Sequence, residues 1–171
     1  SKVPFSVSTS FTLNSSVEKN VNREFKRMKQ LSYDICKELG IDLYQRMEYL
    51  SVISTKVVSQ YERADNSGEL RVILGSLSDL DKNVNIISGK INSKEITEDG
   101  FIEAIVSQSA LVELNLLIGE ELTFLNFQDV DGNTVKVRIV GVYENNGENN
   151  DYWVVSPDSY SKTCMIDSDL F

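Results

Sequence analysis

Histidine is absent from this chain of 171 residues. Its absence removes the most common general base, the most common zinc ligand and the usual hydrolase triads. An enzyme would have to use Asp, Glu, Lys, Ser or Cys, and these residues form no recognisable active-site motif here. The sequence therefore predicts a protein that is not an enzyme and has no catalytic, cofactor-binding or metal-binding residues.

Cysteine is almost as scarce, since Cys36 and Cys164 are the only two in the chain. Two cysteines far apart in sequence do not make a disulfide framework. Free cysteine behaves as a small hydrophobic side chain, so we expect two free and mostly buried thiols. A long-range disulfide between them and a reactive thiol are the alternatives that the sequence leaves open.

Long apolar segments are missing as well. No run of about 18 apolar residues is present, as a transmembrane helix would require, and no signal peptide is recognisable. The chain starts at Ser1 without a methionine and stops abruptly at Asp-Ser-Asp-Leu-Phe. We interpret these ends as those of a domain excised from a larger membrane protein.

Positive charge is in deficit. Lys and Arg total 17 against 26 Asp and Glu, which gives a net charge of −9. This charge repels nucleic acid and anionic membrane surfaces, and no basic stripe stands out along the sequence. The chain is therefore predicted not to bind nucleic acid.

The length is sufficient for one domain with a substantial hydrophobic core. We expect a single domain over residues 1–171, with a division into two lobes as an option. In that division a core of residues 1–60 and 101–171 is interrupted by a loop-rich segment, residues 61–100.

The first third of the chain alternates between strand and helix patterns. Residues 3–12 are rich in β-branched and aromatic types and predict a strand. From residue 17 to 39 apolar side chains recur every three or four positions, which predicts an amphipathic helix ending at Gly40. Its charged face is expected to be solvated. Residues 43–62 predict one long strand or two consecutive strands.

The remainder predicts further strands at residues 69–76, 101–107, 120–127, 134–144, 151–157 and 162–167. Ser107 is expected to cap a short helix over 108–115, and a change of phase at Gly141 predicts a β-bulge. The predicted fold class is α+β: mixed or antiparallel sheets with a long N-terminal amphipathic helix, a short second helix and βαββ-like units.

The segment Asp-Val-Asp-Gly-Asn, residues 129–133, invites a calcium-binding interpretation. An EF-hand loop with its glycine at Gly132 would begin at Phe127 and end at Arg138. Neither side chain can supply the required oxygen ligands. We therefore predict a hairpin turn at these residues.

Two pairs of carboxylates resemble acid–base couples. Glu120 and Glu121 are adjacent on a predicted strand, so their side chains point to opposite faces. Asp79 and Asp81 lie in a polar turn, where Asp commonly caps backbone amides. Neither pair is predicted to be catalytic.

Trp153, Tyr143 and Tyr152 could line a ligand groove, but aromatic side chains on strands are more often part of a core. We predict the core role. The polar segment 144–151 is predicted to be a passive linker rather than a recognition loop.

The order of these elements over residues 70–158 resembles the extracytoplasmic, periplasmic core-like domain of the MacB/FtsX-like permeases of ABC transporters. The family pattern has a strand ending in glycine, an acidic turn, a Gly-Arg/Lys segment, a strand–helix unit, a hairpin and a final proline. The matching positions in this chain are Gly75, Gly89-Lys90, Val106-Ser107, Ala110, Gly119, Val140-Gly141-Val142 and Pro157.

The resemblance implies a non-catalytic domain between the first two transmembrane helices of a permease. It would stand on the extracytoplasmic face of a bacterial cell membrane, extracellular in a Gram-positive cell. It would couple cytoplasmic ATP hydrolysis to the movement or export of a peptide, lipid or lipoprotein, or to the regulation of an extracellular partner.

The partners that the resemblance implies are an ABC ATPase subunit or domain, acting through the membrane part, and a second permease copy in a homodimer. A peptide, lipid or protein client is expected outside the membrane. Two other classes remain open: a secreted binding or adhesion module without a transport role, and an enzyme that uses Asp, Glu or Ser. No cofactor is expected.

Overall fold

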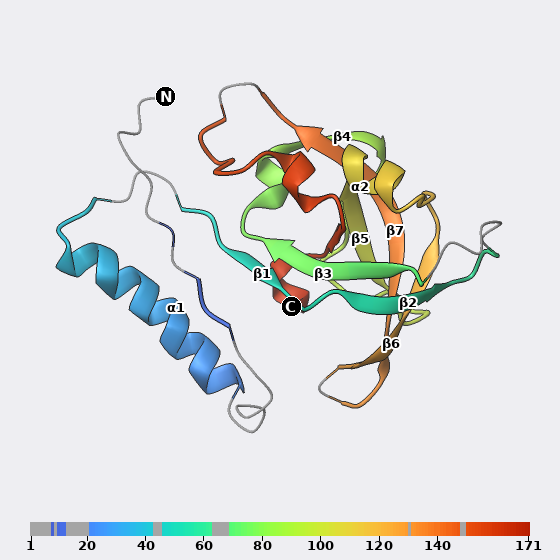
Figure 1. The fold of residues 1–171 in the computed structure, drawn as a ribbon, viewed down its shortest axis with the longest axis horizontal. Coiled ribbons are helices and arrows are strands. Elements are labelled where there is room, and N and C mark those ends of the chain that lie inside the picture. The colour runs from blue at the N-terminus through green and yellow to red at the C-terminus, as the bar shows by residue number, and fades with distance from the viewer. Residues whose placement is uncertain are drawn as a thin grey trace. The chain divides into compact units, whose positions relative to one another are not determined.

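The computed structural model of the chain describes residues 8, 10–12, 21–42, 46–62, 69–129, 131–147 and 150–171. The strand predicted over residues 3–12 lies largely outside this set. The chain divides into two compact units, Ser1–Arg46 and Met47–Phe171. Figure 1 shows the ribbon of both units.

The described part of the first unit forms a long helix, α1 (Val21–Glu38). It ends with Gly40 in the left-handed region at φ +64°, while the backbone N–H of Ile41 donates to the carbonyl of Cys36. Beyond the helix, the guanidinium of Arg46 lies 3.5 Å from the ring centroid of Tyr33 and donates to Ser32 Oγ at 2.8 Å.

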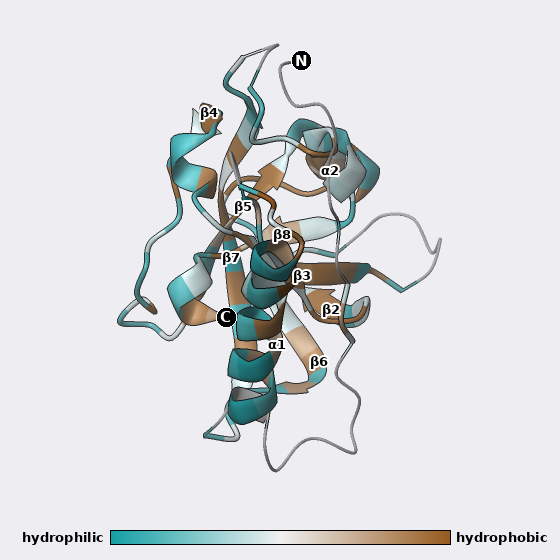
Figure 2. Cartoon of the chain, turned by 90° about the vertical axis from the view of Figure 1, so that its left-hand side faces the viewer, coloured by the Kyte–Doolittle hydropathy of each residue, from teal (hydrophilic) through white to brown (hydrophobic). Residues whose placement is uncertain are grey.

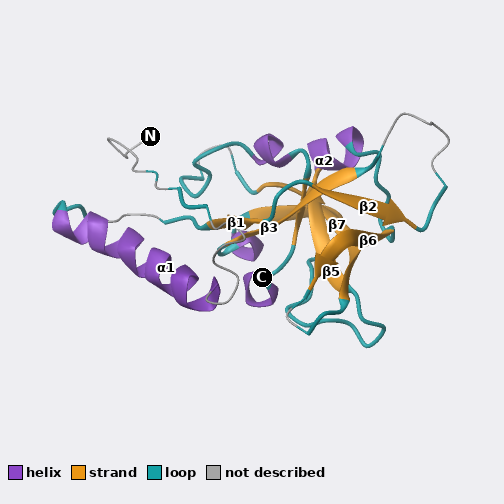
Figure 3. Cartoon of the chain, turned by 60° about the horizontal axis from the view of Figure 1, so that its bottom comes forward, coloured by secondary structure: helices purple, strands orange, loops and turns teal. Residues whose placement is uncertain are grey.

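The second unit is built on six strands that pair in a closed ring. Following the pairing, β3 is joined to β2, β6, β7, β5 and β8 in turn, and β8 pairs back with β3. The β3–β8 and β5–β7 pairs are parallel and the others antiparallel. The six strands are β2 (Thr55–Ser59), β3 (Arg71–Leu77), β5 (Ile102–Ser107), β6 (Glu121–Gln128), β7 (Thr134–Asn145) and β8 (Thr163–Met165). Figures 1 and 3 label all of them except β8.

Two more strands and several short helical segments attach to this barrel. Strand β1 (Tyr49–Ser51) pairs with β3, and strand β4 (Val84–Gly89) pairs with β7. The helical segments are α2 (Gln108–Glu113) and the 3-10 turns η2 (Leu80–Lys82), η3 (Pro157–Tyr160) and η4 (Ser168–Leu170).

The predicted fold class is therefore wrong. The second unit is mostly sheet and closes into a six-stranded β-barrel, rather than an α+β fold of βαββ-like units. Helix α1 belongs to the other compact unit and does not define the class of the barrel. The error has a physical cause: closure depends on the parallel pairing of β3 with β8, which are distant in sequence, and local patterns do not encode that pairing.

Two local predictions also fail. Residues 151–156 form turns rather than a strand, and Pro157 starts η3 with Ser156 as its cap. The segment 61–100 was expected to be loop-rich apart from the strand at residues 69–76, which β3 confirms, yet it also contains edge strand β4. Only Val84 and Ile86 of β4 are partly buried while its later residues are exposed, so its strand pattern is weak.

The barrel interior is a single hydrophobic cluster. It receives buried side chains from all six ring strands, and Figure 2 shows β3 as a largely brown, hydrophobic segment. A second cluster lies on the opposite face of β3, β5, β7 and β8 and includes residues of η2 and η3. The first cluster includes Val72, Val106, Leu122, Phe124, Val137 and Cys164, and the second Leu77, Ile105, Tyr143, Tyr160 and Met165.

Several local predictions are confirmed. Residues 46–62 hold two consecutive strands, β1 and β2. Ser107 caps α2, because its Oγ accepts a hydrogen bond from the Ala110 backbone N–H at 3.1 Å. The register between β5 and β7 shifts so that Ala104 faces Ile139 and Ile105 faces Gly141, which is the predicted bulge.

Candidate functional site

The turn at 129–133 connects β6 and β7, as predicted. Asp129 Oδ1 accepts from the backbone N–H groups of Asp131 and Asn133, and Gly132 lies at φ +83°. The amide of Asn133 donates to Asp129 Oδ2 at 3.0 Å, and the hydrogen bonds from Asn133 are the main cause that lowers the pKa of Asp129. This carboxylate is occupied by the turn itself.

The carboxylate pairs singled out in the sequence do not act together. Glu121 pairs with Arg138 at 2.8 Å, whereas Glu120 accepts hydrogen bonds from other groups of the barrel. Asp79 has a left-handed backbone at φ 56° and pairs with Lys82. Its side chain makes no capping hydrogen bond, so the expected capping role of Asp79 is wrong.

Cys36 and Cys164 are both free and buried, as predicted. Cys164 lies in the barrel interior with 0% of its surface exposed. Burial, with a smaller contribution from Glu120, raises the pKa of the Cys164 thiol to about 12. A thiol so rarely deprotonated at neutral pH is a poor nucleophile.

Cys164 is therefore expected to resist thiol reagents in the folded protein. In a Cys36→Ser variant, we expect Ellman's reagent to react with the remaining thiol at least about a hundredfold more slowly in buffer than in denaturant, because reaction requires unfolding. Cys36, in the parent, is 9% exposed and should react first. Equal rates for Cys36→Ser with and without denaturant would show that Cys164 is accessible.

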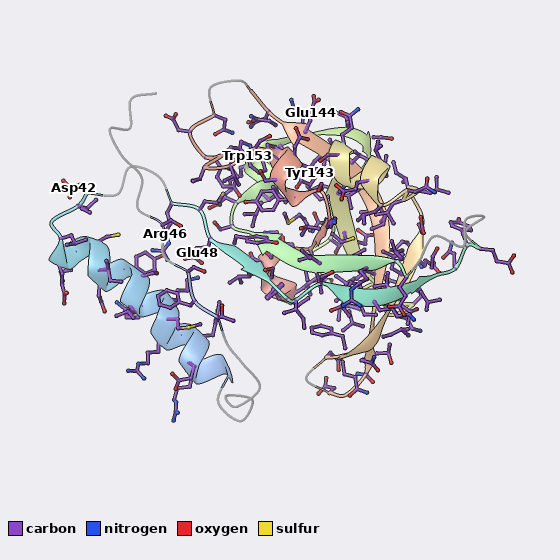
Figure 4. All side chains as sticks on the ribbon, viewed as in Figure 1. Asp42, Arg46, Glu48, Tyr143, Glu144 and Trp153 are labelled. Atoms are coloured by element: carbon purple, nitrogen blue, oxygen red, sulfur yellow. The ribbon has the colours of Figure 1, made fainter. Side chains whose placement is uncertain are left out.

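Tyr143, Tyr152 and Trp153 pack at the second hydrophobic cluster, which confirms their predicted core role. Tyr143 and Tyr152 are buried, and the Trp153 ring stacks on Tyr143 with centroids 6.3 Å apart. Figure 4 labels Tyr143 and Trp153 in this region. Trp153 Nε1 donates to the carbonyl of Asn83 at 3.1 Å, and the Tyr152 hydroxyl donates to the carbonyl of Ser78 at 2.6 Å. These contacts attach the segment after β7 to the η2 turn.

The burial of two glutamates, Glu103 and Glu120, was not predicted from the sequence. Glu103 is 6% exposed; its Oε1 accepts from Lys90 Nζ at 2.7 Å and its Oε2 from the Ser93 backbone N–H at 3.0 Å. The signal for Glu103 was a single acidic residue within an apolar strand, which requires a partner when buried.

Glu120, the second of these glutamates, is 1% exposed. Its Oε1 accepts from Ser59 Oγ at 2.6 Å, and its Oε2 accepts from the Leu117 backbone N–H at 2.8 Å. The carboxylate thus joins β2 to the loop between α2 and β6. Both buried glutamates are engaged by structural partners.

Two backbone segments pack closely where β4 ends beside β7. A Cβ atom added to Gly89 would lie 2.1 Å from the Val140 carbonyl oxygen. A Cβ atom added to Gly141 would lie 2.1 Å from the Lys90 carbonyl oxygen. The Lys90 N–H donates to the Val140 carbonyl at 3.0 Å. We call Gly89, Lys90, Glu103 and Gly141 the β4–β7 junction.

A shallow pocket of about 300 Å³ lies on the outer side of β2, β6 and β7. Arg138, beside it, pairs with Asp99 at 2.6 Å and Glu121 at 2.8 Å, and its guanidinium lies 4.2 Å from the Phe101 ring centroid. The charges of this region are therefore largely neutralised. The lining residues are Val58, Ser59, Gln60, Phe101, Glu121, Thr123 and Lys136.

The Asp99–Arg138 pair makes a testable contribution to acid stability. The pKa of the Asp99 carboxyl is lowered from 3.8 to about 2. The largest cause is the hydrogen bond from Arg138, and the second is the hydrogen bond from Thr97. A folded-state pKa below the unfolded one stabilises the protein above pH 3.8, and this contribution is lost as the pH falls toward 2. We expect urea midpoints to fall less between pH 4 and 2 in Asp99→Asn than in the parent. Parallel curves for the two proteins would contradict this assignment.

Within the described parts of the chain, no group of three or more His, Cys, Asp or Glu side chains is placed to hold a metal ion. The same residues include no helix that is both long enough and apolar enough to cross a membrane. No protein-family model matches the chain, and a comparison with curated proteins finds no similar sequence.

Proposed function

We propose that this chain is the extracytoplasmic domain of an ABC transporter permease of the MacB/FtsX-like type. In this role it catalyses nothing. It transmits motion that starts with ATP hydrolysis in a cytoplasmic ATPase to a client or partner outside the membrane. The full-length permease would act as a homodimer, and the client would be a peptide, a lipid, a lipoprotein or an extracellular protein.

The observation that carries the proposal is the β4–β7 junction. The resemblance depends on scattered residues such as Gly89-Lys90 and Gly141, and single residues of this kind are weak evidence. In the structure, Gly89 and Gly141 occupy positions where any side chain would collide with backbone. Lys90 reaches the buried Glu103. The pattern therefore reflects physical requirements of this barrel, as expected if the resemblance has a structural origin.

The closed barrel suits a mechanical role. Each of its six ring strands has a paired neighbour on both sides, so a displacement applied to one strand is resisted by the whole ring. The buried carboxylates Glu103 and Glu120 are used to hold loops against strands. These features support a stiff body that transmits motion rather than a site that performs chemistry.

The coding sequence on both sides of residues 1–171 provides the first test. A permease domain requires a run of about 20 apolar residues shortly before Ser1 and another soon after Phe171. A cleavable signal peptide without a following apolar segment, or polar flanks on both sides, would refute the proposal. The secreted binding or adhesion module would then become the leading interpretation.

A further inference from the structure

Helix α1 and the residue after it carry exposed apolar side chains. Leu31 is 46% exposed, Tyr33 43% and Leu39, just after the helix, 63%. Phe25, Met28 and Ile35 are only partly buried, and Cys36 is the one buried apolar residue among the described residues of α1.

Most of these apolar residues share one side of the helix. Phe25, Met28, Ile35 and Leu39 lie at spacings of three, seven and four residues on a single face, with Leu31 at its margin. The opposite side is rich in exposed basic residues, and Figure 2 shows α1 as largely teal on the side turned to the viewer. The basic residues are Arg23, Lys26, Arg27, Lys29 and Lys37.

Charge is also divided unevenly between the two compact units. Residues 1–46 contain eight basic and five acidic residues, a net charge of +3. Residues 47–171 contain nine basic and 21 acidic residues, a net charge of −12. The overall charge of −9 is therefore the sum of a cationic first unit and a strongly anionic barrel unit. An anionic surface would attract the first unit and repel the barrel unit.

We propose that α1 binds the surface of a membrane that contains anionic lipid. A helix with a Lys- and Arg-rich polar face, an apolar face bearing Phe and Leu, and low mean hydropathy lies in the plane of the interface. The apolar face of α1 would enter the boundary of the acyl chains, and its basic residues would lie near the lipid phosphates. This inference does not depend on the proposed function, because it concerns the chain by itself.

Flotation of the full chain with lipid vesicles tests the proposal. We expect binding to vesicles of phosphatidylcholine with about 30 mol % phosphatidylglycerol at about 0.1 M salt, and much weaker binding to phosphatidylcholine alone. Raising the salt to about 0.5 M should weaken the interaction, because screening removes its electrostatic part.

Two double variants separate the electrostatic and apolar parts. Lys26→Gln with Lys37→Gln should lower the partition coefficient about tenfold, because two charges near the anionic surface are lost. A matched control is Lys94→Gln with Lys136→Gln, which makes the same charge change at exposed positions of the barrel unit. The control should bind like the parent.

Leu31→Gln with Leu39→Gln should also lower the partition coefficient, again about tenfold, since less apolar area enters the membrane. The matched control is Ile53→Gln with Val112→Gln, at barrel-unit positions that are 85% and 75% exposed. All four target positions are exposed, so the variants are expected to keep their fold, which circular dichroism verifies.

Failure of the parent chain to float with anionic vesicles overturns the proposal. Equal effects of the target and control variants would overturn it too, because binding would then not involve α1. A dimer that dissociates in Leu31→Gln with Leu39→Gln, without any vesicle binding, would assign the apolar face of α1 to a second copy of the chain instead.

Discussion

Gly141→Ala is expected to destabilise the barrel strongly. The added Cβ would lie 2.1 Å from the Lys90 carbonyl oxygen and 3.1 Å from its carbonyl carbon, both backbone atoms. Relief of the collision requires β4 to move away from β7, which breaks the Lys90–Val140 hydrogen bond. We expect the free energy of unfolding to fall by at least about 3 kcal/mol, measured by urea denaturation.

Two other glycines supply graded controls. Gly132 has φ +83° with no atom within 4 Å of an added Cβ, so Gly132→Ala should cost about 1 kcal/mol from backbone strain alone. Gly147 has open space and no positive φ, so Gly147→Ala should change stability by less than about 0.5 kcal/mol. If Gly141→Ala were as stable as Gly147→Ala, the β4–β7 junction as described would be wrong.

The second large effect is expected for Glu120→Ala. Truncation removes the buried acceptor for Ser59 Oγ and for the Leu117 backbone N–H, and both of these hydrogen bonds are part-buried. A hydrogen bond to a charged group contributes about 1.5–3 kcal/mol, and two are lost, so the free energy of unfolding should fall by about 3 kcal/mol. Chemical denaturation of the two proteins under identical conditions gives this difference.

Glu121→Ala is the matched control, because it removes the same side chain one position along the chain. Glu121 is 34% exposed and pairs with Arg138 on the outer side of the barrel, so its loss should cost only about 1 kcal/mol. An equal loss of stability in both variants would show that Glu120 has no special role in joining β2 to the loop before β6.

Local features of the barrel were predictable because each has a local physical cause. Ser107 precedes an apolar helical pattern and caps it, and residues 129–133 contain the Asp, Gly and Asn that a tight turn requires. The change of phase at Gly141 was visible in the alternation of apolar residues along β7. These features depend on residues a few positions apart.

The global arrangement was not predictable in the same way. Closure of the barrel requires three-residue strand β8 to lie parallel to β3, and nothing in either segment identifies its partner. Edge strand β4 was missed because most of its side chains are exposed. The buried roles of Glu103 and Glu120 also appear only after folding brings Lys90 and Ser59 beside them.

An outward-facing domain of a membrane protein can be reached by a reagent that does not cross the membrane, so surface labelling of intact cells tests the proposed function. Ile53 is 85% exposed, so a cysteine placed there should be accessible, while Cys164 is buried and Cys36 can be replaced by serine. The full-length protein with Cys36→Ser and Ile53→Cys would be produced in intact cells of its source and treated with a membrane-impermeant maleimide.

We predict that the maleimide labels the cysteine at position 53 equally fast in intact cells and in lysed cells. The labelled protein should sediment with the membranes. Labelling that occurs only after the cells are lysed would place the domain in the cytoplasm and contradict the proposed function. Labelled protein recovered in the culture medium would also contradict it, in favour of a secreted binding module.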